Sequence, residues 1–183
     1  MIGDTDLYFG PDIVIPLRAG CGFEEDWQEV GEVTFRETFG GEAHVLRPGH
    51  KTKYHLTITA GSNAVWRVPA IADIPPGSLI TVHTIKEWTS KIPAGTKQCI
   101  LSRPPVPGSV WVYDPANPDI RYPFTQDEED SRIVKIAANA TKHLAVGHKH
   151  IITGLRGPMT GQQNFLSGLG TWSLELREWK APA

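Results

Sequence analysis

The sequence predicts an all-β protein, built as an antiparallel β-sandwich or barrel with at most one short helix. Glycine and proline are frequent and dispersed, with 18 and 15 of the 183 residues, and they divide the chain into short segments. Several segments alternate apolar and polar residues with the period of two that a half-buried strand requires. One or two small β-domains with long Pro/Gly-rich loops are therefore expected.

The clearest strand in the first half covers residues 53–60. Its alternate positions are apolar and place one set of side chains on a single face: Tyr54, Leu56, Ile58 and Ala60. Segments 32–38, 43–46, 78–85 and 98–101 are also rich in β-branched or aromatic residues and bounded by turn residues, so each is predicted to be a strand.

In the second half, residues 171–179 form the clearest strand, because Trp172, Leu174 and Leu176 alternate with polar residues. Segments 109–113, 133–137 and 149–155 are further candidates. The stretch 125–145 is open to a second interpretation. The run 126–130, with acids at 127–130, favours the start of a short helix, whose apolar face would carry Ile133, Ile136 and Ala137.

Prolines concentrate in residues 92–118 and mark either long surface loops or a domain boundary. We place a weak boundary near Arg103. It divides the chain into an N-terminal β-domain, 1–103, and a segment 104–183 that is a second β-domain or a continuation of the same sheet.

Charge and composition exclude several classes of protein. The net charge of −2 is spread along the chain and offers no basic patch for phosphates, so nucleic acid is not expected as a primary partner. No apolar run approaches the roughly 18 residues of a membrane span. The first ten residues lack the pattern of a secretory signal. Synthesis in a reducing cytoplasm is expected, since Cys21 and Cys99 form no disulfide or zinc motif.

Three histidines, His143, His148 and His150, lie within eight residues. On a strand, His148 and His150 would point to the same face, as metal ligation requires. The neighbouring sequence offers Lys149, Asn139 and a distant acidic run, which do not complete a ligand set. We therefore expect solvated or hydrogen-bonded histidines and no metal.

No other pattern indicates catalysis. Acids cluster at residues 24–29 and 127–130, but consecutive acids in a turn point apart and are usually solvated. Asp119 and Arg121 predict a surface ion pair. Neither a nucleophile elbow nor a phosphate-binding loop occurs, and both cysteines are expected to be small buried residues. We expect no catalytic residue and no cofactor.

Six tryptophans are the most unusual feature: Trp27, Trp66, Trp88, Trp111, Trp172 and Trp179. The alternation assigns Trp172 to the core. Trp179 shares a face with Glu175 and Arg177, and an aromatic residue on a polar face is typical of a contact surface. Trp179, Glu175 and Arg177 are the candidate interface.

Two blocks carry a resemblance to a known family. The first is KYHLTITAGS at 53–62, WRVPA at 66–70 and PGSLITV at 76–82; the second is the ending GTWSLELRE at 170–178. They resemble the small minor tail proteins of long, non-contractile-tailed bacteriophages, several of which close on Trp-Ser-Leu-x-Leu-x-Glu. The resemblance implies a structural virion protein of the tail tip or baseplate, which contacts other tail proteins and copies of itself.

The residues also leave a second function open. A β-sandwich that binds carbohydrate or cell-surface ligands would stack sugar rings on exposed tryptophans. Trp27, Trp66, Trp88 and Trp111 are the candidates for that platform.

Overall fold

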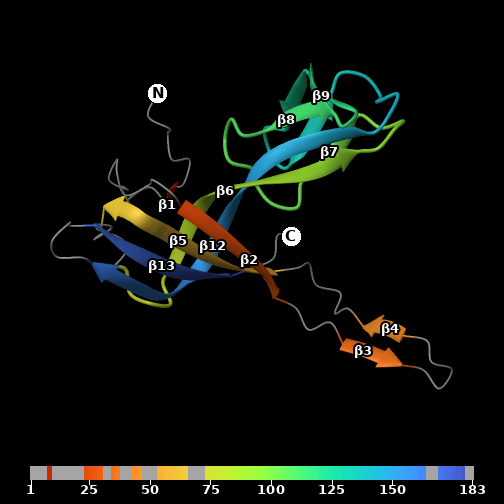
Figure 1. Cartoon of the computed structure of the whole chain (residues 1–183). Helices are drawn as coiled ribbons and strands as arrows, with labels where there is room; N and C mark the ends of the chain where they lie inside the picture. Colours follow the sequence, from red (N-terminus) through yellow and green to blue (C-terminus); the bar gives the residue numbers. More distant parts are fainter. Residues whose placement is uncertain are drawn as a thin grey trace. The chain divides into compact units, whose positions relative to one another are not determined.

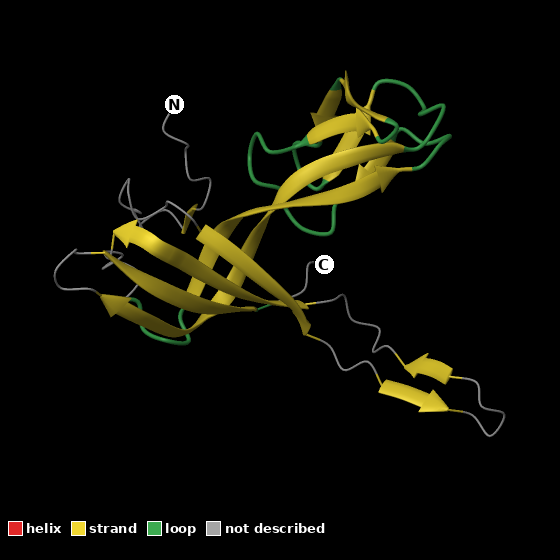
Figure 2. Cartoon of the chain, viewed as in Figure 1, coloured by secondary structure: helices red, strands yellow, loops and turns green. Residues whose placement is uncertain are grey.

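The computed structural model describes residues 8–9, 23–30, 34–37, 43–46, 53–65, 73–163 and 169–179. Within these residues all regular structure is strand, and the sheets are antiparallel (Figures 1 and 2). The predicted all-β class is confirmed, and the sheets are consistent with a sandwich. No helix in these ranges is long and apolar enough to cross a bilayer.

The strands fall in two groups along the chain. The first group lies before residue 95 and comprises β1 Tyr8–Phe9, β2 Phe23–Val30, β3 Thr34–Glu37, β4 Ala43–Leu46, β5 Lys53–Val65 and β6 Leu79–Ile92. The second group comprises β7 Gln98–Ile100, β8 Trp111–Asp114, β9 Asn117–Tyr122, β10 Phe124–Gln126, β11 Ile133–Ile136, β12 Leu144–Gln163 and β13 Leu169–Glu178.

The chain forms two compact units, each built from segments that are distant in sequence. The first unit comprises Met1–Ile15 and Thr81–Ile152, and the second comprises Pro16–Ile80 and Thr153–Ala183. Strands β6 and β12 contribute residues to both. Arg103 lies inside the first unit.

In the second unit, β13 pairs with both β12 and β5, and β5 pairs with β2. Alternate residues of β5 and β13 are buried and form one apolar face: Leu56, Ile58, Ala60, Trp172, Leu174 and Leu176. The two segments with clear hydrophobic alternation, 53–60 and 171–179, thus lie in strands, apart from the last residue of the second. Strands β3 and β4 pair with each other, Thr34 opposite Leu46, and with no other described strand.

The strands of the first unit belong to two sheets. In one sheet β1 pairs with β6, β6 is next to β12, and β8 pairs with β12 and β9. The other sheet has the order β10-β11-β7. Apolar residues of these strands and of the adjoining loops form one buried cluster: Ile92, Leu101, Val110, Val112, Val134, Ala140, Leu144 and Val146.

Gln126 ends β10, and the acidic residues 127–130 lie between β10 and β11, so the helix alternative is wrong. The side chain of Asp127 accepts hydrogen bonds from the backbone N–H groups of Glu129 and Asp130, at 3.2 and 3.4 Å. A carboxylate that satisfies the following backbone groups favours a turn over a helix interior. Ile133 and Ile136 belong to β11, in line with the strand prediction for 133–137.

Strand β12 is much longer than the predicted segment 149–155, because its glycines do not break it. A Cβ atom on Gly154 would lie 2.7 Å from the carbonyl oxygen of Arg177, and one on Gly157 would lie 2.8 Å from Cβ of Glu175. These glycines permit close approach to β13, whereas Gly77, with φ of +87°, occupies a turn. A register shift between Arg156 and Met159 accommodates the intervening Gly-Pro.

Candidate functional site

The polar face of the second unit's sheet, called the outer face below, lies opposite its apolar core. The pairing register arranges its residues in rows across the strands. One row contains Asp26, Thr57 and Glu175, and the next contains Gln28, His55 and Arg177. Nε2 of His55 lies 3.4 Å from Oε2 of Glu175. The outer face therefore carries both signs of charge beside uncharged polar groups.

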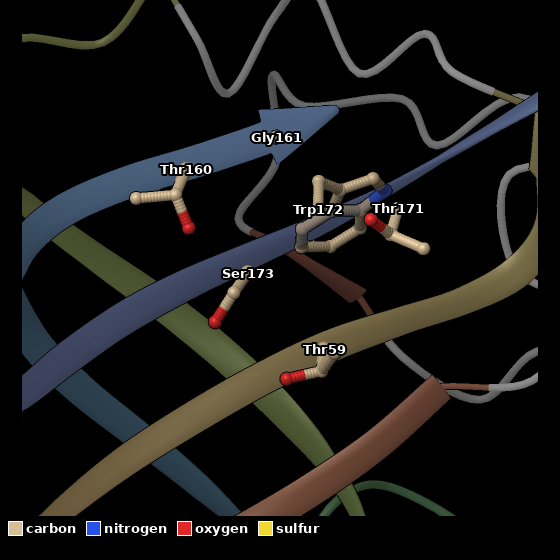
Figure 3. A pocket seen from close by; sticks show the side chains of 6 residues that line it. All are labelled: Thr59, Thr160, Gly161, Thr171, Trp172 and Ser173. Atoms are coloured by element: carbon tan, nitrogen blue, oxygen red, sulfur yellow. The ribbon is translucent and has the colours of Figure 1, made fainter. Parts of the chain in front are cut away.

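The row beyond Asp26 is rich in hydroxyl groups and borders a pocket (Figure 3). Thr59 of β5 is opposite Ser173 of β13, which is opposite Thr160 of β12. The pocket has a volume of about 380 Å³, and its lining is completed by Gly161, Thr171 and Trp172. Each hydroxyl can donate one hydrogen bond and accept others. None of its described lining residues carries a charge, so the pocket is suited to a neutral, hydroxyl-rich ligand.

The candidate interface residues lie at the end of β13. Trp179 follows the strand and is 48% exposed, and Arg177 is exposed. The backbone of Trp179 is fixed, since its N–H donates to the carbonyl of Thr153 at 3.1 Å and its carbonyl accepts from Nζ of Lys53 at 3.4 Å. An exposed indole on a fixed backbone loses little conformational freedom on binding, which suits a contact residue.

The acids of residues 24–29 lie on strand β2 and not in a turn, and β2 is not among the predicted strands. Glu24 and Asp26 are exposed on the outer face. Glu25 lies on the opposite side, where Oε2 accepts a hydrogen bond of 3.2 Å from Nε1 of Trp27. An acid at a core-side position breaks the hydrophobic alternation. That break, with the low strand preference of Asp and Glu, hides β2 from pattern reading.

His148 and His150 point to the same face of β12, as the sequence predicts, and both are buried with 1% exposure. Their Nε2 atoms are 2.9 Å apart, and Nδ1 of His148 lies 3.2 Å from the carbonyl oxygen of Val146. The ring of His150 stacks on Trp88 of β6, with centroids 5.0 Å apart. Of the two alternatives for these histidines, solvated or hydrogen-bonded, the structure shows the second.

His143 is not part of this group. It is exposed, and its Nδ1 accepts a hydrogen bond of 3.1 Å from the N–H of Ala94. In the described ranges, no three His, Cys, Asp or Glu residues are placed to hold a metal ion.

Burial sets the protonation of the buried pair. It lowers the pKa of His148, and it lowers the pKa of His150 to about 3, with smaller contributions from His148 and Arg103. Both rings are therefore neutral at physiological pH. Among the neighbours, Trp88, Thr84 and Arg103 carry no sequence signal that connects them to the histidines.

The described tryptophans offered as a glycan platform, Trp27, Trp88 and Trp111, have different partners. Trp27 packs edge-on against Tyr54, with centroids 5.4 Å apart, and Trp88 stacks on His150. Trp111 and Tyr113 lie together on β8, with the guanidinium of Arg121 5.6 and 5.8 Å from their ring centroids.

Arg121 therefore covers two aromatic rings, and the predicted ion pair between Asp119 and Arg121 is not formed. Trp66, the block 66–70 and Cys21 lie outside the described residues.

Three aspartates of the first unit have cationic partners. Asp114, Asp127 and Asp130 bond to Lys142, Lys135 and Arg132 respectively, and these hydrogen bonds lower the pKa of each carboxyl. Burial raises the pKa of the Cys99 thiol to about 11, which removes its nucleophilic form at neutral pH.

Comparison with other proteins adds no assignment: no model of a known protein family matches this chain, and no curated protein does.

Proposed function

We propose that the chain is a structural protein of a bacteriophage tail, which forms part of the tail tip or baseplate by association with copies of itself and with other tail proteins. It acts in the virion after synthesis in the host cytoplasm. The sequence resemblance in blocks 53–62 and 170–178 motivates this proposal. Both blocks lie largely in paired strands, β5 and β13, that form the centre of one sheet.

The observation that carries the proposal is the exposure of Trp179 beside Arg177. Exposed indole and guanidinium groups are the side chains most enriched at the energetic centres of protein interfaces. The backbone around Trp179 is held at both its N–H and its carbonyl, so the indole is presented from a defined position. Mixed charges on the outer face supply the selectivity that an ordered assembly needs.

Sedimentation of the purified chain tests this surface. We expect the wild type to self-associate and the variant Trp179→Ala/Glu175→Lys/Arg177→Glu, which keeps the net charge, to sediment as a monomer. The matched control exchanges two exposed charges of the first unit, Lys97→Glu/Asp119→Lys. It should behave as wild type. Equal association of all three proteins would show that β13 is not the contact surface.

A second candidate function is recognition of a carbohydrate or a cell-surface glycan. The hydroxyl-lined pocket on the outer face favours it, because Thr59, Thr160, Thr171 and Ser173 offer both donors and acceptors to a polyhydroxylated ligand. Titration of the chain with a glycan array checks this function. If Thr160→Val abolishes glycan binding and Trp111→Ala does not, the pocket is the binding site. If Trp111→Ala abolishes binding and Thr160→Val does not, the Trp111 and Tyr113 rings are the binding site.

A further inference from the structure

The buried pair His148–His150 has a hydrogen-bond pattern that fixes both tautomers. A carbonyl oxygen can only accept, so the contact of His148 Nδ1 with Val146 assigns the proton of His148 to Nδ1. Its Nε2 is then an acceptor, and the 2.9 Å contact requires His150 to donate from Nε2. The lone pair of His150 is left on Nδ1, which is buried without a hydrogen-bond partner.

The pair joins three segments of the first unit. The hydroxyl of Thr84, on β6, donates to the carbonyl of His150 at 3.0 Å and accepts from its N–H at 3.1 Å. The ring of His150 stacks on Trp88, also on β6, and its Nε2 lies 3.5 Å from Oγ of Ser102. The segment 104–106 is hydrogen-bonded to β12 on both sides of His150. The N–H of Val106 donates to the carbonyl of Lys149, and the N–H of Ile151 donates to the carbonyl of Pro104.

The surroundings do not favour a proton on either ring. The rings contact each other, Trp88, Ser102 and the Val146 carbonyl, and none of these described partners is a carboxylate. Two described charged groups on this side of the unit are cationic. Arg103, 3% exposed, acts on His150 from the loop after β7, and Lys86 of β6 lies 4.7 Å from the centroid of the Trp88 ring.

The other titratable neighbours, His83 on β6 and Lys149 on β12, occupy strand positions that alternate with those of Thr84 and His150. A proton that arrives at the pair has one open basic atom, Nδ1 of His150. There it forms a buried imidazolium next to Arg103, with an N–H that no acceptor meets. Such a group is strongly disfavoured in the folded chain.

We propose that the pair is an acid-sensitive latch: while both rings are neutral they hold β12 to β6 and to the loop 101–106, and acidification releases these contacts and opens this part of the first unit. The sign follows from linkage. Burial lowers the pKa of His150 from 6.5 to about 3, so between these values the unfolded chain binds a proton that the folded chain does not. The stability that neutral His150 contributes is fully present above pH 6.5 and decreases as the pH falls below this value.

The size of the effect is measurable at a pH where the carboxyl groups remain ionised. At pH 5, the shift of His150 favours the open or unfolded chain by about 30-fold relative to pH 7.5. Asp114, Asp127 and Asp130, whose pKa values are lowered from 3.8, contribute only at lower pH.

Urea unfolding of the full chain at pH 7.5 and pH 5.0 tests the latch. We expect the unfolding constant of the wild type to rise by at least 30-fold, because the lowered pKa values of His148 and His83 add to the share of His150. His150→Gln keeps a donor at the Nε2 position and cannot titrate, so its rise should be about 30-fold smaller than that of the wild type. His143→Gln removes an exposed imidazole of the same unit and should keep it. Equal pH dependence in the two variants, or none in the wild type, would overturn the proposal.

Two further measurements on the wild type keep the test valid if His150→Gln does not fold. Nitrogen NMR of the imidazoles at pH 5.5 should show His148 protonated at Nδ1 and His150 at Nε2, both neutral; a ring that titrates near pH 6.5 would contradict the latch. Amide exchange, corrected for its intrinsic pH dependence, should show earlier loss of protection at Val106 and Ile151 than at Leu174 when the pH falls from 7.5 to 5.0. Equal protection changes at these sites would contradict local opening.

Discussion

The indole of Trp111 lies against the backbone of Gly147, so close that a Cβ atom on Gly147 would be 2.2 Å from Cε2 of the ring. The two residues are opposite each other in the β8–β12 pair. Gly147 thus makes room for a large aromatic side chain on a buried strand, and the contact belongs to the first unit alone.

We therefore expect Gly147→Ala to destabilise the protein by about 2–3 kcal/mol, because the ring or the strand must move to accept the methyl group. Urea unfolding at pH 7.5 measures this change. In the double variant Gly147→Ala/Trp111→Leu the two costs should be clearly less than additive. A single variant within 0.5 kcal/mol of wild type would show that the close approach is not a constraint.

The buried side chain of Arg156 offers a second prediction about stability. It is 6% exposed on the core side of β12, opposite Leu176, where Nη1 donates to the carbonyl of Gly157 at 3.1 Å and Nε has no hydrogen-bond partner. Arg156→Met should raise the free energy of unfolding by about 1 kcal/mol, since a buried charge without full hydrogen bonding is replaced by an apolar chain of similar length. The exposed counterpart Arg177→Met should change it by less. A clear loss of stability in Arg156→Met would mean that the cation has a structural role.

Asp114 should make the protein less stable at low pH. The hydrogen bonds from Lys142 and from the N–H of Ala116 lower its pKa below 3.8, so its contribution is present above that value and is lost as the pH falls through the folded pKa. The melting temperature of Asp114→Asn should lie below that of wild type at pH 6, and the two should converge near pH 2. A difference that stays constant between these pH values would rule out the ion pair as its cause.

Cys99 should be slow to alkylate in the folded protein. Burial raises the pKa of its thiol to about 11, so the thiolate is scarce at pH 8. In a Cys21→Ser background, iodoacetamide should modify Cys99 far more slowly in buffer than in 6 M urea. Similar rates in both conditions would indicate that the thiol is reached without unfolding.

The extent to which the sequence predicts this structure follows from hydrophobic alternation. Strands β5 and β13 were predictable because every second residue is apolar, whereas β2 was not, because Glu25 stands on its core side. In β12, Gly147 and Gly154 resemble turn residues in sequence and are in fact sites of close approach to Trp111 and Arg177.

Of the candidate sites, the shared face of His148 and His150 follows from the period of two. Their burial and their contact with Trp88 do not, because they depend on how β6 packs against β12, a tertiary choice that local pattern does not contain. The hydroxyl row of the outer face is equally hidden, since Thr59, Thr160 and Ser173 are brought together by register alone.

The most direct test of the proposed function is quantitative peptide mass spectrometry of virions purified from the source of the chain, with the major tail-tube protein as the internal standard. If the proposal is correct, the chain is present at a few copies per particle, as expected for a tail-tip ring. Its absence from intact particles would contradict the proposal.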